Sequence, residues 1–183
     1  GNVTPVTVKI ADANGTEVTT IYTPKIVGVK PSAESSKTNG IQGETQTSAI
    51  KFDAADTDDT TVNFAKGTAI INSESKSVEL DKTSVKLVGA ENGTVNGDGS
   101  VTVANQGTYK LVKDETGAIA VTFTPLATFT GEAHAVTVSI TDANGTEATT
   151  TYTPTVVSVA PTAKESATVG KQGQAQTSQI VFD

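Results

Sequence analysis

The sequence predicts an all-β protein, an immunoglobulin-like β-sandwich repeated along a tandem array. Thr is the commonest residue and Val is abundant, and both residue types pack well on the pleated surface of a sheet. Short alternating segments follow one another at spacings of roughly ten residues, with turn residues between them. No segment has a sustained helical period. The pattern therefore favours strands throughout.

The tandem array follows from an internal copy. Residues 6–53 align with residues 136–183 without a gap, at an offset of 130 residues, and roughly thirty of the forty-eight positions are identical. Chance does not produce such a match, so the chain holds a little over one period. The sequence contains no Met, and we expect it to be a piece of a longer protein.

The expected organisation has three parts. Residues 1–29 are expected to be the C-terminal hairpin of a preceding repeat, residues 30–159 one complete repeat, and residues 160–183 the linker and first strand of the next repeat. Residues 30–46 are rich in Ser, Gly and charge, which predicts a joint between repeats. Within the repeat, strands are expected at 47–52, 78–80, 85–88, 101–103, 109–111 and 119–123, and in a hairpin that pairs 136–140 with 148–152.

Two copies of one turn join the strands of the repeated hairpins. Its sequence is Asp-Ala-Asn-Gly, and the structural residues are Asp12, Asn14 and Gly15, with Asp142, Asn144 and Gly145 in the second copy. Asp caps the turn through its side chain, Asn suits the bridge region and Gly adopts a positive φ, which predicts a type I turn with a bulge. The aromatic residues are expected in the core or at corners: Tyr22, Phe52, Phe64, Tyr109, Phe123, Phe129, Tyr152 and Phe182.

Composition excludes several kinds of function. Cys is absent, which removes disulfides, thiolate metal sites and cysteine nucleophiles. The formal net charge of −7 argues against a nucleic-acid partner, because few positive charges are left to neutralise phosphates. No apolar run approaches the roughly 20 residues of a membrane span, so no membrane insertion is expected.

Candidate sites for chemistry are few. His134 is the single histidine, and Thr4 stands at the corresponding position of the other copy, so we expect a surface-loop residue and no catalytic residues. The sequence predicts no enzyme and no cofactor. Asp53, Asp56, Asp58 and Asp59 supply four carboxylates within seven residues, a weak candidate for calcium. Because the regular spacing of a calcium loop is missing, an exposed acidic loop is the favoured interpretation.

Three blocks of sequence carry a family resemblance. They are residues 136–156 (VTVSITDANGTEATTTYTPTV), residues 118–125 (AIAVTFTP) with Phe129-Thr130-Gly131, and Gly-x-Gln-Gly-x-x-Gln-Thr at 40–47 and 170–177. Together they resemble the CshA-type fibril repeat of Gram-positive surface fibrillar adhesins. The period is longer than is typical of that family, with extra residues around 54–99.

The resemblance implies a function. It predicts a structural repeat in the stalk of a bacterial adhesin, outside the cell and anchored to the cell wall, projecting an adhesive region. The expected partners are neighbouring repeats of the same chain. Two alternatives stay open: an adhesive module that binds a host or bacterial surface glycoprotein, and a filament subunit that assembles by β-strand complementation.

Overall fold

The computed structural model describes residues 1, 3–53 and 57–181. These residues form sixteen strands and no helix, which confirms the predicted all-β class. A seven-stranded sheet has the order β10 (Gly93–Val95), β11 (Val101–Val103), β12 (Gly107–Lys113), β13 (Ile119–Pro125), β5 (Gln46–Lys51), β6 (Val62–Ala65) and β3 (Ser32–Glu34). The second sheet has the order β14 (Gly131–Glu132), β16 (Glu147–Val157), β15 (Val136–Asp142) and β9 (Leu80–Ala90), with β4 (Ser36–Ile41) on β16.

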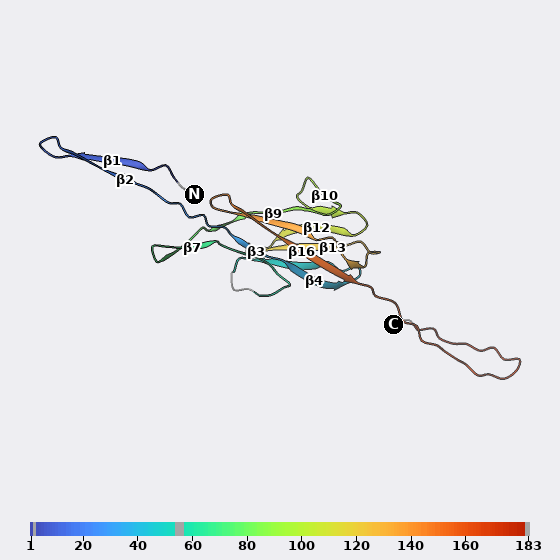
Figure 1. Ribbon diagram of the computed structural model, residues 1–183. Helices are drawn as coiled ribbons and strands as arrows, with labels where there is room; N and C mark the ends of the chain where they lie inside the picture. The colour runs from blue at the N-terminus through green and yellow to red at the C-terminus, as the bar shows by residue number, and fades with distance from the viewer. Residues whose placement is uncertain (2, 54–56, 182–183) are drawn as a thin grey trace.

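Two hairpins stand apart from this sandwich. β1 (Val6–Ala11) pairs with β2 (Glu17–Tyr22), and β7 (Thr68–Ile71) pairs with β8 (Glu74–Ser77). Figure 1 shows the β1–β2 hairpin and the C-terminal tail extending from opposite ends of the sandwich. The β7–β8 hairpin projects from the end at which the chain enters.

The core lies between the two sheets. Tyr109 of β12 and Tyr152 of β16 come from opposite sheets, and their rings meet edge to face with centroids 6.0 Å apart. Phe123 lies 4.6 Å from Tyr109, measured between ring centroids. Alternate residues of the strands fill the remaining space, and the buried hydrophobic residues all lie between Ile50 and Val156. One repeat therefore contains its own complete interior.

The first and last parts of the repeat are joined by a parallel ladder. β4 pairs with β16 over six register positions, from Ser36 opposite Tyr152 to Ile41 opposite Val157. Parallel strands require a long crossover connection, and here the whole sandwich is that connection. The pairing therefore closes the repeat on itself.

Residues 30–46, expected as a joint between repeats, lie mainly in strands. This segment forms β3, β4 and the first residue of β5, and Ser36 and Gln46 within it are buried. Its inward-facing polar side chains hydrogen-bond with one another inside the sandwich, while many of the residues between them are exposed. Val157 is the last residue of the β4–β16 ladder, and Val27 is its counterpart in the preceding copy. Only residues 28–31 separate Val27 from the start of β3, and these four residues are called the joint below.

The β1–β2 hairpin repeats the β15–β16 hairpin in pairing but not in burial. Val6 lies opposite Tyr22 and Ile10 opposite Val18, in the same register as Val136 with Tyr152 and Ile140 with Ala148. In the sandwich these residues are buried, whereas Tyr22 is 63% exposed. The expectation that Tyr22 belongs to a core is therefore not met here, because nothing among the described residues covers this face of the hairpin.

The two copies of one isoleucine allow a direct test of the core. Ile140→Ala removes a fully buried side chain, so we expect a loss of about 2–5 kcal/mol in the free energy of unfolding. Ile10→Ala is the matched control, since Ile10 is 67% exposed and its loss is expected to change that free energy by less than about 0.5 kcal/mol. Urea unfolding of both variants measures the difference. Equal losses would contradict the proposed core.

Candidate functional site

The repeated turn has the same hydrogen bonds in both copies. Oδ1 of Asp12 accepts from the backbone N–H groups of Asn14 and Thr16, at 2.8 Å each. Gly15 has a φ of 83°, and its N–H donates to the carbonyl of Asp12. Asp142 makes the equivalent bonds to Asn144 and Thr146, and Gly145 has a φ of 79°. Local sequence alone is enough to form this turn, because the exposed copy has it too.

The two turns differ in the burial of the Asp side chain. Asp142 is buried beside the start of β9, where the N–H of Ala143 donates to the carbonyl of Glu79. Its Oδ1 is fully used by the turn, while its Oδ2 has no hydrogen-bond partner among the described residues. Asp12 is exposed. The turn of the complete repeat is therefore packed into the entry end of the sandwich.

A polar ladder links β4, β5 and β16. Ser48 Oγ donates to the carbonyl of Thr60 and therefore accepts from Ser36 Oγ, 2.8 Å away. Thr38 Oγ1 donates to Gln46 Oε1 at 2.6 Å and accepts from Tyr152 Oη at 2.7 Å. These bonds satisfy polar groups that the sandwich buries, and each such bond contributes on the order of 1 kcal/mol.

Gln46 extends this ladder to the backbone of β16. Its Nε2 donates to the carbonyl of Thr155 at 3.0 Å. Gly40 lies beneath its side chain, and a Cβ at position 40 would lie 2.6 Å from Gln46 Cγ. The Gly-x-Gln-Gly-x-x-Gln-Thr motif therefore has a packing reason: the glycine leaves room for the glutamine that holds β16.

The C-terminal tail contains the same contacts outside a sandwich. Ser166 Oγ lies 2.5 Å from Ser178 Oγ, and the side chains of Thr168 and Gln176 meet at 2.6 Å. A Cβ at Gly170 would lie 2.7 Å from Gln176. These residues are all exposed. The β4–β5 arrangement thus needs only short-range contacts and no covering β16.

Burial changes the acidity of the two core tyrosines. Desolvation raises the pKa of Tyr109 far above its ordinary value, and the neighbouring Tyr152 contributes in the same direction. Desolvation also raises the pKa of Tyr152, partly opposed by its hydrogen bond with Thr38. Tyr109 Oη donates to the carbonyl of His134 at 2.6 Å. Both phenols therefore serve as neutral donors that anchor β16 and the loop before β15.

Gly67 lies against the segment through which the chain enters the repeat. A Cβ added at Gly67 would lie 2.3 Å from the carbonyl oxygen of Lys30 and 2.6 Å from Cγ1 of Val29. Gly67 is buried, and its carbonyl accepts from the N–H of Val78, which closes the base of the β7–β8 hairpin. The joint between repeats therefore lies directly against the base of that hairpin.

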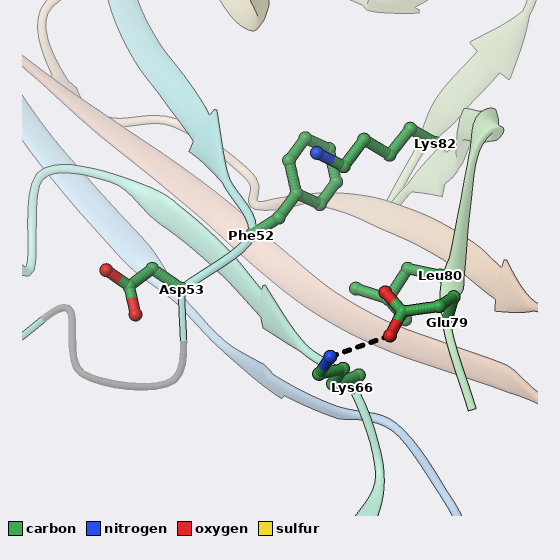
Figure 2. A pocket seen from close by; sticks show the side chains of 6 residues that line it. All are labelled: Phe52, Asp53, Lys66, Glu79, Leu80 and Lys82. Carbon is green, nitrogen blue, oxygen red and sulfur yellow. Dashed lines mark hydrogen bonds and ion pairs between the residues drawn. The ribbon is translucent and has the colours of Figure 1, made fainter. Parts of the chain in front are cut away.

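A hollow of about 300 Å³ lies near the same end. Figure 2 shows its lining: Phe52, Asp53, Lys66, Glu79, Leu80 and Lys82. Lys82 Nζ lies 4.7 Å from the centre of the Phe52 ring, and Lys66 Nζ pairs with Glu79 Oε1 at 2.6 Å. The lining has two positive and two negative side chains. The Lys66–Glu79 ion pair and the contact of Lys82 with the Phe52 ring hold its walls together.

His134 lies in a loop, as expected, and is partly buried. Its backbone N–H donates to Gln106 Oε1 at 2.8 Å, and its Nδ1 lies 2.8 Å from the carbonyl oxygen of Glu91. These contacts tie the loop before β15 to two turns of the sandwich. Every bond joins His134 to a structural group.

The acidic loop is only partly described. Asp58 Oδ1 accepts from the backbone N–H and the hydroxyl of Thr60, and the carbonyl of Asp59 accepts from the N–H of Lys37. Asp53 follows β5, and Asp56 lies outside the described residues. Within the described ranges, no group of three or more His, Asp or Glu side chains could hold a metal ion. Calcium at this loop therefore stays a prediction.

The internal copy, the closed sandwich and the short joint define a self-contained β-sandwich repeat module. Residues 28–156 match the family described as the surface adhesin CshA repetitive domain. Because the match covers well over half of the chain, the chain belongs to this family. Comparisons with curated proteins and with solved structures found no match. The part of the chain that the structure describes has no helix long and apolar enough to cross a membrane.

The two copies of one tyrosine test the polar ladder. Tyr152→Phe removes the donor to Thr38 inside the sandwich, and we expect the free energy of unfolding to fall by about 0.5–1.5 kcal/mol. Tyr22→Phe is the control, since the equivalent hydroxyl is exposed on the hairpin. Denaturant titration of both variants measures the effect. Equal free energies of unfolding for the two variants would contradict a stabilising role for the polar ladder.

Unfolding at alkaline pH tests whether burial raises the pKa of Tyr109. Below pH 10 the raised pKa of Tyr109 leaves stability unaffected, because the phenol is protonated in both states. Above pH 10 the unfolded phenol loses its proton while the buried one keeps it, so the free energy of unfolding falls as pH rises. Tyr109→Phe removes this contribution. Unfolding measured from pH 7 to 11 should show a weaker alkaline decline in the variant than in the parent, and identical declines would contradict the assignment.

Proposed function

We propose that this chain is a stalk repeat of a bacterial surface adhesin, which projects an adhesive region from the cell wall and resists pulling. Membership of the surface adhesin family supports a position at the cell surface. The observation that carries the mechanical role is the parallel ladder of β4 with β16. The role is structural, and we propose no enzymatic activity for it.

The geometry of the ladder supports resistance to force. Tension on a stalk pulls the chain before β3 in one direction and the chain after Val157 in the other. Because β4 and β16 are parallel, this tension slides one strand along the other, so all six register positions are loaded together. An antiparallel terminal pair would open one bond at a time. The side chains of Thr38 and Gln46 add bonds that the same sliding must break.

The short joint supports a stalk of defined reach. Residues 28–31 separate the end of one ladder from the first strand of the next repeat, and four residues span at most about 14 Å. Their contact with Gly67 further restricts the angle at which the chain enters. Successive repeats therefore act as a series of closely spaced rigid units.

An adhesive function for the repeat itself is the second candidate. β10 is the outer strand of the seven-stranded sheet, and its side chains Thr94 and Val95 are exposed. An outer strand can pair with an extended segment of a partner such as a surface glycoprotein. This candidate predicts saturable binding by one isolated repeat, whereas a pure stalk role predicts none.

Stretching the chain by its two ends tests the stalk role. We expect one main unfolding step with a contour-length increase of about 40 nm, since about 130 residues extend together. Thr38→Ala should lower the unfolding force without changing the step, because it weakens the link of β4 to β16. Thr168→Ala is the control in the exposed tail. A continuous extension without a step would refute the proposal.

A further inference from the structure

The β7–β8 hairpin pairs with no other strand among the described residues. It forms a two-stranded sheet of its own, and Ile70 on one face is 73% exposed. Ser75 lies opposite Ile70 in the register, so the two share this face. An isolated two-stranded hairpin is only marginally stable in water. The exposed face with Ile70 is therefore available to a further surface, and packing there would stabilise the hairpin.

The position of the hairpin indicates where that surface lies. Its base at Gly67 touches Val29 and Lys30 of the joint, and it projects from the end at which the chain enters (Figure 1). β7 has four residues and is about 13 Å long, which matches the roughly 14 Å that the joint can span. The hairpin is thus long enough to reach the preceding repeat.

The opposite end of the repeat carries an exposed apolar patch, which we define as Ile41, Leu126 and Val157. Ile41 and Val157 are partners in the β4–β16 ladder. The adjacent loop is held against them, because Gln42 Nε2 donates to the carbonyl of Ala127 and the N–H of Gln42 donates to the carbonyl of Val157. In an array this patch faces the entry end of the next repeat.

We infer that the β7–β8 hairpin clasps the preceding repeat, with Ile70 packed on the exit-end patch of that repeat. The inference rests on the proposed tandem stalk and adds the contact that stiffens its joints. The partner is a second copy of the same module. Val27 is the position of the preceding repeat that corresponds to Val157, and it is 42% exposed. Position 41 varies, since Lys171 stands there in the following copy, so Val157 is the contact to test.

The test uses two successive copies of residues 28–157, which form one period each and contain the whole buried core. Because the chain has no Cys, Val157→Cys in the first copy and Ile70→Cys in the second create a single possible disulfide. Mild oxidation with glutathione disulfide should close it within the chain, seen as blocked thiols and a faster band in a non-reducing gel. In the control, Lys76→Cys replaces Ile70→Cys, because Lys76 lies on the opposite face of the same hairpin.

The expected result is closure at least ten times faster for the Ile70 pair than for the Lys76 pair. Equal rates, or no closure of either pair, would overturn the clasp. Stretching the same two-copy array separates this failure from failure of the stalk. If the disulfide does not close preferentially and the array still unfolds in two equal steps, the clasp alone is rejected. If the array extends without steps, the stalk is rejected.

Thermal unfolding provides a second measurement without Cys. Ile70→Ser should lower the unfolding midpoint of the two-copy array by a few degrees, because it removes the apolar contact between repeats. The same change in a single copy should have no effect, since Ile70 faces water there. An equal shift in both would mean that Ile70 acts only within its own repeat.

Discussion

The parallel pairing of β4 with β16 is the constraint on which this structure depends. It joins residues more than a hundred positions apart, from Ser36 opposite Tyr152 to Ile41 opposite Val157. Closure of this ladder brings Tyr152 over the opposite sheet, where it meets Tyr109, and places Gln46 under the carbonyl of Thr155. The core, the polar ladder and the positions of both chain ends all follow from this one contact.

The chain displays the same sequence in two environments, which separates local from long-range causes. The β1–β2 hairpin keeps the register of β15–β16, and the tail keeps the Ser–Ser and Thr–Gln contacts of β4–β5. Neither needs the core to form. Burial of their apolar faces, however, occurs only in the complete repeat. The local contacts of these pieces are therefore independent of the core, whereas the burial of their apolar faces depends on the complete repeat.

This arrangement connects packing to function. In the proposed stalk, a module closed by its terminal strands would transmit tension through a ladder loaded as a whole, and a joint of four residues would pass that tension to its neighbour. The entry end carries the features that distinguish it from the exit end: the hairpin β7–β8, the buried turn at Asp142 and the glycine that receives the joint. The exit end is simpler and apolar at three positions. Two different ends suit a head-to-tail array.

The sequence by itself determined the strand class, the internal copy, the turns at Asp12 and Asp142 and the family resemblance, because these depend on residue type, short-range spacing and identity between copies. It assigned residues 30–46 to a joint, since the Ser, Thr and Gln of this segment have the composition of a linker. Only the tertiary structure shows that they pair with a strand over a hundred residues away. The β7–β8 hairpin was missed for a related reason: its alternation is short and its partner surface is not in its own repeat. Local patterns encode how a strand or turn forms, whereas which strands meet is decided by the burial of their faces together.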